Sequence, residues 1–331
     1  MKTAVVGTGS IGRRHIGNLL ALRMCDVVAV SEHGRRSCLE IDGTAVPVVH
    51  DFDTVLTDAG VGAVIISNPT ALHLDYTRRA ILAGKHVYLE KPASVSADGV
   101  SQLIDAATKA GVVVAIGTQY RFNELLVRLR ERIHAGDAGL IVSVEAHLGE
   151  HIADYHPDED YRQSYAARSE LGGGVLLTQI HQIDYINWIF GPFHSAYAIG
   201  GRRSGLEIDV EDCVSYLLHG RDGISVYGHL NYLERPKRVD LTVTGTQGTF
   251  AWHYFANSLS FMPAKLDAQE IVEQRTFDRN AMFVATMRDF LDVVRTGGQP
   301  RATLEDGCAA LRIVDAIKSA CRTGHVTKIA A

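Results

Sequence analysis

The stretch Met1–Gly12, MKTAVVGTGSIG, decides the fold of the amino-terminal part of this chain. A short apolar run stops at Gly7, and the hexapeptide GTGSIG that begins there satisfies the pattern G-x-G-x-x-G. The residues that follow place Ile16, Leu19 and Leu20 at the i, i+3, i+4 spacing of an amphipathic helix. A strand, a glycine turn and a helix in this order predict a dinucleotide-binding unit.

The positions of this motif have separate physical tasks. Gly7 permits the tight turn, Gly9 lets the backbone approach a pyrophosphate, and Gly12 lets the helix pack closely on the strand. The pyrophosphate would lie on the backbone N–H groups at the start of the helix, around Ser10 and Ile11, where the positive end of the helix dipole favours an anion.

The composition limits the class of protein. A chain of 331 residues is too long for one ordinary core, so we expect two domains. Its 46% hydrophobic and 21% charged residues are typical of a soluble globular protein. The net charge of −5 argues against a nucleic-acid partner, since phosphate binding needs clustered Lys and Arg. No apolar run has the length of a membrane span or a signal-peptide core. Five scattered cysteines without a CxxC pair indicate reduced thiols and a cytoplasmic location.

The first 117 residues alternate between strand and helix patterns. Apolar runs predict strands at 26–31, 62–67, 85–90 and 112–116. A helix is expected to start at Ser96, and the stretch that ends at 47–49 is expected to be irregular. Repeated βα units with apolar strands predict a doubly wound parallel sheet, that is, a Rossmann domain over residues 1–120.

Residues 121–331 have a different character and are expected to form a second, α+β domain. Alternation with period two predicts a strand through 142–148, and similar segments lie at 212–218, 223–232, 238–245 and 248–254. Glycines at the turns 220–223 and 245–248 predict hairpins. One apolar helix, Val175–Phe190, interrupts the strands, and the tail is expected to be helical. The pattern indicates a large, mostly antiparallel open sheet with helices on one face.

The end of the second predicted strand carries residues that would select the cofactor. Glu32 follows Gly12 by 20 residues, at the position where a carboxylate usually receives the adenine-ribose hydroxyls, which favours NAD. Arg35 and Arg36 come directly afterwards and could hold the 2′-phosphate of NADP instead. The alternative is a solvated cluster of charges on a loop.

Glu90-Lys91-Pro92 lies at the carboxyl end of a predicted parallel strand, the edge at which doubly wound folds bind ligands. Proline restricts the backbone of Lys91, so its ammonium is aimed. An aimed cation beside a nicotinamide can bind a substrate hydroxyl and stabilise the alkoxide that develops as hydride leaves. Alone, the residue could equally be an ordinary surface lysine.

The helix that follows Gly172–Gly174 is apolar on so many sides that it should be largely buried. His181 and Asp184 are three residues apart and therefore share a face of this helix. A buried carboxylate beside an imidazole would orient it and favour its charged form, which suits a general base. The alternative is a structural pair that ties the helix to the sheet.

Two further polar segments allow a functional and a plain structural interpretation. Residues 155–171 include Tyr161, Arg162, Tyr165 and Arg168, which could hydrogen-bond a polyhydroxylated or anionic ligand. Alternatively, the segment could be a helical excursion from the domain that is simply exposed to solvent. Residues 147–151 read HLGEH and match the zinc pattern H-x-x-E-H, but that motif requires a helix. Because the flanking residues alternate as in a strand, we expect no metal.

Taken together, these motifs resemble the glucose–fructose oxidoreductase / inositol dehydrogenase (Gfo/Idh/MocA) family over nearly the whole chain. The resemblance implies a Rossmann domain and an α/β domain whose open sheet often serves as an oligomer interface, hence a homodimer or homotetramer. The motifs that carry it, in order, are GTGSIG, Ser67-Asn68-Pro69-Thr70 with His73, EKP at 90–92, Tyr120-Arg121-Phe122, GGGVLL, the His181–Asp184 pair and WIFG at 188–191.

The resemblance further implies NAD(P)-dependent oxidation or reduction of a sugar, cyclitol or related hydroxyl compound. Lys91 matches the catalytic lysine of the family and His181 its catalytic histidine. Many members carry an aspartate one turn before that histidine, where Leu177 and Thr178 stand here, so Asp184 is expected to orient His181. Besides the glycine turn, Glu32 and Arg36, the expected cofactor ligands are Ser67, Asn68, Pro69, His73, Glu90 and Lys91; the expected substrate ligands are Arg121, Tyr161, Arg162, Tyr165, Arg168 and Thr178.

In the expected mechanism, His181 takes the hydroxyl proton and Lys91 steadies the developing alkoxide, so both must reach the same carbinol. A second hypothesis is a redox hydrolase or lyase that uses NAD to oxidise a glycoside transiently, without net cofactor turnover. A third is a non-catalytic nucleotide sensor. Lys91, His181 and Asp184 argue against a sensor, which has no need of them.

Overall fold

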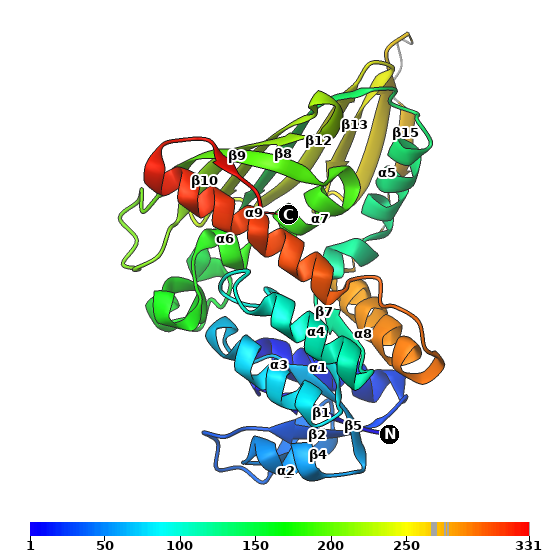
Figure 1. Ribbon diagram of the computed structural model, residues 1–331, viewed down its shortest axis with the longest axis vertical. Helices are drawn as coiled ribbons and strands as arrows, with labels where there is room; N and C mark the ends of the chain where they lie inside the picture. Colours follow the sequence, from blue (N-terminus) through cyan, green and yellow to red (C-terminus); the bar gives the residue numbers. More distant parts are fainter. Residues whose placement is uncertain (266–269, 275, 277, 331) are drawn as a thin grey trace. The chain divides into compact units, whose positions relative to one another are not determined.

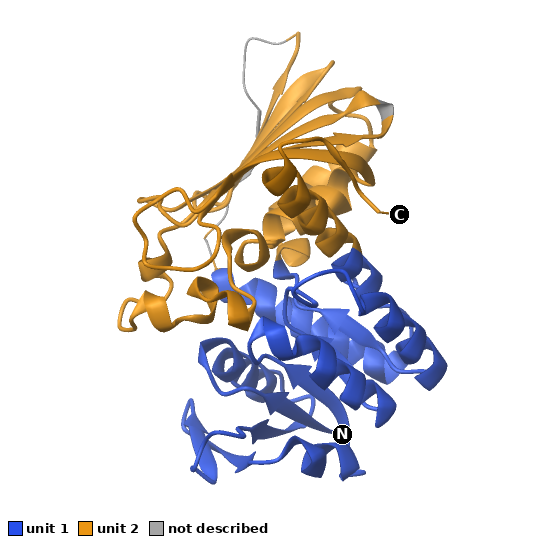
Figure 2. Ribbon diagram, turned by 60° about the vertical axis from the view of Figure 1, so that its left-hand side comes forward, with its two compact units in different colours: residues 1–119, 279–308 blue, residues 120–278, 309–331 orange. Residues whose placement is uncertain are grey.

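The computed structural model describes residues 1–265, 270–274, 276 and 278–330. The chain divides into two compact units, coloured separately in Figure 2. One comprises residues 1–119 with 279–308, and the other residues 120–278 with 309–331. The sequence predicted a single boundary after residue 120 with the whole tail in the second domain, whereas segment 279–308 belongs to the first unit.

The first unit is built on a Rossmann-type sheet. Within the described residues the strand order is β3-β4-β2-β1-β5-β6-β7, and all neighbours pair parallel except β3 and β4. The central strands are almost wholly apolar because helices cover both faces of such a sheet. The strands are β1 (Lys2–Val6), β2 (Asp26–Val30), β3 (Cys38–Ile41), β4 (Thr44–Val49), β5 (Val61–Ile66), β6 (His86–Leu89) and β7 (Val114–Ile116).

The helices of this unit follow the predicted alternation, with two local differences. They are α1 (Ser10–Leu22), α2 (Phe52–Thr57), α3 (His73–Leu82), α4 (Val100–Ala110) and α8 (Arg279–Thr296), with the first residues of α9 (Leu304–Thr323). The helix expected from Ser96 begins only at Val100, after Gly99 in a left-handed conformation. The expected irregular stretch contains the hairpin of β3 and β4, which turns at Asp42 and Gly43, both with positive φ.

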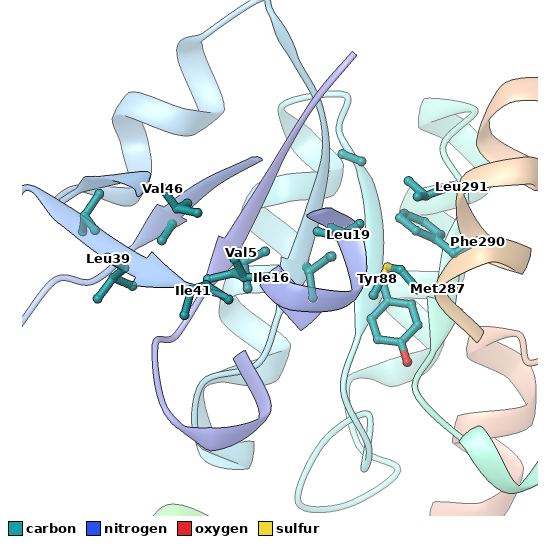
Figure 3. Close-up of a cluster of buried hydrophobic side chains, with 14 of the residues drawn as sticks. Val5, Ile16, Leu19, Leu39, Ile41, Val46, Tyr88, Met287, Phe290 and Leu291 are labelled. Atoms are coloured by element: carbon teal, nitrogen blue, oxygen red, sulfur yellow. The ribbon is translucent and has the colours of Figure 1, made fainter. Parts of the chain in front are cut away.

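The core explains why α8 belongs to the first unit. Its residues Met287, Phe290 and Leu291 are buried in the same apolar cluster as Ile16 of α1 and Tyr88 of β6 (Figure 3). The rings of Tyr88 and Phe290 lie 5.8 Å apart in an edge-on arrangement. The apolar face of a helix from the tail therefore completes a core that the amino-terminal residues begin.

The second unit is built on a mostly antiparallel sheet, as predicted. Within the described residues its strand order is β15-β14-β13-β12-β8-β11-β10-β9-β16, with β8 and β11 paired parallel and the other neighbours antiparallel. Figure 1 labels β8, β9, β10, β12, β13 and β15 of this sheet. Both expected hairpin turns connect antiparallel strands. The strands are β8 (Ile141–Gly149), β9 (Phe193–Gly201), β10 (Cys213–Gly220), β11 (Ser225–Asn231), β12 (Arg238–Gly245), β13 (Gly248–His253), β14 (Ser258–Pro263), β15 (Glu270–Gln274) and β16 (Thr327–Lys328).

One face of this sheet is packed and the other carries exposed side chains. In β8 the side chains of Val144, Ala146 and Leu148 are buried, as the alternation predicts, whereas Val142 is 53% exposed. The helices α5 (Glu124–His134), α6 (Val175–Thr178) and α7 (His181–Phe190) contact strands of the sheet. None of the described helices is at once long and apolar enough to pass through a membrane.

The predicted continuous helix Val175–Phe190 is wrong, because α6 ends at Thr178 and α7 begins at His181. The side-chain amide of Gln179, in the break, donates hydrogen bonds of 3.0 Å to the Tyr155 hydroxyl and to the Asn231 carbonyl. These bonds hold the break against the sheet. As a result His181 is the first residue of a separate helix.

Candidate functional site

The glycine turn between β1 and α1 has the tight geometry that the motif predicts. Gly7 has a φ of +95°, and a Cβ there would lie 2.9 Å from the backbone oxygen of Ser67. A Cβ at Gly12 would collide with the carbonyl oxygen of Gly7. The hydroxyl of Ser67 donates to the carbonyl of Val6 at 2.7 Å. Strand, turn and helix are thus locked together where only glycine fits.

Gly9 occupies a different environment. It is the N-cap of α1, with a φ of −72°, and a Cβ built on it meets nothing within 4 Å. No side chain caps the helix there, and the first turn contains no acidic residue. The start of α1 therefore offers backbone N–H groups and open space, which fits the pyrophosphate of a dinucleotide.

The contrast between these two glycines gives a prediction. Gly9→Ala is expected to fold with nearly unchanged thermal stability and to bind NADH about tenfold more weakly, a loss of about 1.4 kcal/mol, because the methyl group occupies the space of the phosphate. Gly12→Ala should lower the melting temperature, since its methyl group meets the protein itself. NADH fluorescence titration and thermal unfolding measure both effects. Unchanged affinity in Gly9→Ala would contradict the pyrophosphate assignment.

Glu32 is the second residue after β2 and is exposed at the carboxyl end of the sheet. Its Oε2 accepts a hydrogen bond from the hydroxyl of Tyr76, whose ring stacks on Phe52 at 4.8 Å. Burial, and then the bond to Glu32, raise the pKa of Tyr76 to about 12. Tyr76 thus orients the Glu32 carboxylate at the position expected for ribose recognition. The side chain of Arg36, four residues later in the sequence, is exposed.

The Glu90-Lys91-Pro92 segment leaves β6 at the same carboxyl end. Glu90 is buried, and its Oε1 lies 2.6 Å from Nε2 of His15 in α1. Its Oε2 accepts a hydrogen bond of 3.2 Å from the backbone N–H of Lys91. The half-buried Lys91 therefore follows a carboxylate that is fixed at both oxygens.

His73 connects two of the predicted cofactor segments. Its Nδ1 forms a hydrogen bond of 2.7 Å with the carbonyl of Pro92, and its Nε2 one of 2.9 Å with the carbonyl of Asn68. Burial lowers the pKa of His73. This residue joins the loop after β5 to the loop after β6. The structure therefore brings Ser67, Asn68, His73, Glu90 and Lys91 together along one edge of the first unit.

In the second unit, Asp184 of α7 forms a buried ion pair with Arg121. The guanidinium donates to Oδ1 from Nη2 at 2.8 Å and to Oδ2 from Nε at 3.0 Å. The sequence predicted that Asp184 orients His181 and that Arg121 binds substrate, and it did not predict that Arg121 and Asp184 pair with each other. Because Arg121 lies in the short turn Gln119–Phe122, the pair anchors α7 to the start of this unit.

His181 begins α7 and is 8% exposed. Its ring lies 5.0 Å from the ring of Tyr120. Tyr120 also contacts Tyr185, Trp252 and Tyr254, with ring centroids 5.0 to 6.3 Å apart. The sequence assigned Tyr120 no role, although it lies in the Tyr120-Arg121-Phe122 motif. Aromatic packing on one side of His181 restricts the orientations that its ring can take.

Thr178, at the end of α6, is buried and accepts a hydrogen bond of 2.7 Å from the hydroxyl of Tyr232. Burial raises the pKa of Tyr232 well above its usual value, so this hydroxyl stays protonated. The side chain of Thr178 is thus held in place in the region where, according to the family resemblance, many members carry an aspartate.

The polar segment 155–171 forms three short 3-10 turns, Tyr161–Gln163, Tyr165–Ala167 and Ser169–Leu171. Arg162 pairs with Asp160 and with Glu207, while Arg168 pairs with Glu170. These pairs are exposed, so each contributes little stability. The segment therefore combines buried backbone turns, at Ala166 and Ala167, with a high density of charged groups.

His147 of the HLGEH sequence lies on β8, as its alternation predicts, and pairs with Glu234. Across the described part of the chain, no group of three or more His, Cys, Asp or Glu side chains is arranged to hold a metal ion.

Family models match both units. The model described as "Oxidoreductase family, NAD-binding Rossmann fold" matches residues 1–118, and the "GFO/IDH/MocA C-terminal domain" matches residues 126–251. These ranges contain the glycine turn, the Glu90–Lys91 segment and α7.

Similar proteins extend over the whole length. D-xylose 1-dehydrogenase (NADP(+)) 2 from Haloferax volcanii is 24% identical over 99% of this chain and 100% of its own length. Inositol 2-dehydrogenase from Salmonella typhimurium is 26% identical over 98% of this chain and 95% of its own. The solved structure of levoglucosan dehydrogenase in complex with NADH has a TM-score of 0.89 at 17% identity, over 100% of this chain and 99% of that one. The last comparison shows that the fold is shared.

Proposed function

Because this chain belongs to the Gfo/Idh/MocA family of NAD(P)-dependent oxidoreductases, we propose that it transfers a hydride between nicotinamide and a hydroxyl or keto carbon of a sugar, cyclitol or sugar derivative. The observation that carries this proposal is the edge of the first unit, where a pyrophosphate-compatible turn, the Asn68 loop and Glu90–Lys91 lie together. The names of the xylose and inositol relatives support the substrate class.

The proposed chemistry uses the side chains of Lys91 and His181. The bound nicotinamide supplies the acceptor or donor of hydride. The Lys91 ammonium binds the substrate oxygen and stabilises the negative charge that develops on it. His181 accepts the hydroxyl proton during oxidation and returns it during reduction. Asp184 contributes as the partner of Arg121, because this ion pair fixes the helix that begins at His181.

The remaining proposed contacts follow from the environment of each side chain. The glycine turn takes the pyrophosphate, Glu32 the adenine ribose, and Asn68 and Glu90 line the nicotinamide half. For the substrate we propose Thr178, whose hydroxyl is fixed by Tyr232, together with Tyr161, Arg162, Tyr165 and Arg168. The exposed guanidinium groups in the last set can exchange a carboxylate partner for a ligand.

Cofactor choice is proposed to depend on Glu32. Glu32→Ser is expected to raise the ratio of kcat/KM with NADP⁺ to kcat/KM with NAD⁺ by about tenfold or more, because it removes a carboxylate that repels a 2′-phosphate and leaves Arg36 in place. The matched control is Glu40→Ser, an exposed carboxylate on β3. A ratio that moves equally in both variants would remove Glu32 from cofactor recognition.

The two relatives and the neighbour described above are all named as dehydrogenases, so the redox hydrolase receives no support.

We propose that the chain forms a homodimer or homotetramer through the open face of the second unit's sheet. Tyr197, Leu217 and Tyr227 lie opposite one another in neighbouring strands and are 36–52% exposed. An apolar row across a wide sheet is a surface that a second copy can cover. Light scattering of the purified chain tests this arrangement, and a monomer at micromolar concentration would exclude it.

The experiment that tests the proposed function is a panel of sugars, cyclitols and sugar acids, assayed for NAD⁺ and NADP⁺ reduction by absorbance. The corresponding ketones are assayed in the reverse direction. Turnover of one class above the others identifies the substrate class. Cleavage of a glycoside without accumulation of reduced cofactor would instead establish the hydrolase.

A further inference from the structure

His15 is a fully buried residue of α1 that no motif assigns to the site. It comes three residues after Gly12, on the helix that begins at the glycine turn. Its Nε2 lies 2.6 Å from Oε1 of Glu90, which is 75 residues away in the sequence. The other carboxylate oxygen of Glu90 accepts the backbone N–H of Lys91. A continuous chain of contacts therefore runs from the dinucleotide-binding helix to the lysine.

We propose that His15 is a positioning residue for Lys91: it holds the Glu90 carboxylate as an anion, and this anion fixes the Lys91 backbone and balances the lysine charge. The inference rests on the function proposed above for Lys91, and it adds a residue that lies outside the glycine turn and outside the other motifs quoted above.

The surroundings of the pair support this role. The ring of Tyr88 lies edge-on to His15 at 5.2 Å, and Phe283 lies 6.4 Å away. A Cβ at Gly117 would come within 3.0 Å of Glu90 Oε1 and of the Tyr88 hydroxyl. Side chains and backbone thus enclose the carboxylate closely. A buried carboxylate in such a place needs a donor at each oxygen, or it binds a proton.

The electrostatic balance at Glu90 depends on His15. Burial by itself raises the pKa of Glu90, but the hydrogen bond from His15 and the charges of His15, Lys91 and His73 outweigh burial and bring this pKa below its usual value. The other titratable groups facing Glu90 are His73 on α3 and Tyr88 on β6. Burial lowers the pKa of His73, against the opposing effect of its hydrogen bonds and of the Glu90 charge, and burial raises the pKa of Tyr88.

Removing the donor is therefore expected to move the pKa of Glu90 upward into the neutral range. His15→Met keeps the volume and removes the N–H, whereas His15→Gln keeps an N–H donor near the position of Nε2. The decrease in kcat from about pH 8 to about pH 6 should be about tenfold larger in His15→Met than in the wild type. The reason is that Glu90 becomes protonated in this variant and no longer holds Lys91. His15→Gln should follow the wild-type profile. KM for NADH should stay within about twofold in both variants, since the glycine turn is unchanged.

A second readout does not depend on turnover. Carbon NMR of side-chain carboxyl groups, with the Glu90 signal assigned by its loss in Glu90→Gln, should show Glu90 ionised throughout this pH range in the wild type and in His15→Gln. In His15→Met the same signal should titrate. Thermal unfolding of the three proteins controls for folding, and a merely structural role would lower stability in His15→Met without a new titration.

The outcomes separate this inference from the proposed function. The inference would be overturned if kcat of His15→Met depended on pH as kcat of the wild type does, and if the Glu90 signal of His15→Met did not titrate. If Lys91→Met retains turnover while Glu90 titrates in His15→Met, the proposed role of Lys91 fails and the coupling of His15 to Glu90 stands. If Lys91→Met is inactive and His15→Met matches His15→Gln in both readouts, the inference alone fails.

Discussion

Lys91→Met is expected to lower kcat by about a thousandfold, equivalent to about 4 kcal/mol of activation free energy, while the Kd for NADH changes by less than about threefold. Methionine matches the length of the lysine side chain but carries no charge and donates no hydrogen bond. The oxygen of the reacting carbon then develops its charge without a cation. The Glu90 contacts with His15 and with the backbone of residue 91 do not use the lysine side chain, so the edge of the sheet should keep its shape.

This result is measured by steady-state kinetics on the substrate found in the panel and by NADH fluorescence titration. Lys109→Met, an exposed lysine of α4 in the same unit, is the matched control and should retain wild-type kcat. Turnover in Lys91→Met within tenfold of the wild type would remove the lysine from the mechanism. A large loss of NADH affinity would assign it to cofactor binding instead.

Arg121→Met is expected to destabilise the second unit by about 4 kcal/mol, because it leaves the Asp184 carboxylate buried without its guanidinium partner. Methionine retains most of the volume, so the loss of packing is small. Exposed pairs behave differently: Arg128→Met, which removes the exposed pair with Glu131 on α5, should cost at most about 1 kcal/mol.

Urea unfolding followed by tryptophan fluorescence measures this difference, since both tryptophans of the chain, Trp188 and Trp252, lie in the second unit. The double variant Arg121→Met with Asp184→Leu should recover much of the stability that Arg121→Met loses, because no unpaired charge is left in the interior. A midpoint for Arg121→Met equal to that of Arg128→Met would show that the buried pair is not what anchors α7.

The sequence predicted those parts of the fold that depend on neighbouring residues. The glycine turn, the alternation of strands and helices up to Ile116 and the period-two strands of the second unit are local patterns, and the structure confirms them. The β3–β4 hairpin also has a local signal, the Asp42-Gly43 turn, so the expected irregular stretch could have been predicted as a hairpin. The break before His181 has no such signal, because neither glycine nor proline stands at Gln179 or Ile180, and the partners to which Gln179 donates lie in distant segments.

The polar partnerships were the least predictable part of the site. His181 and Asp184 share one turn, so the sequence suggested that they pair, but their spacing does not point to Arg121, an ion-pair partner of Asp184 that lies 63 residues earlier. Similarly, nothing local connects His15 to Glu90. Buried charges are matched by whatever group the tertiary fold brings to them, and residue spacing within one element does not reveal that group.

The recruitment of α8 into the first core has a consequence for biosynthesis. A ribosome makes the strands of the nucleotide-binding unit first, but Met287, Phe290 and Leu291 emerge only after residues 120–278 have been translated. Until then the surface around Ile16 and Tyr88 has no helix to cover it, and the nascent chain carries an unfinished apolar face. The order in which this polypeptide is made therefore differs from the order in which its first core can close.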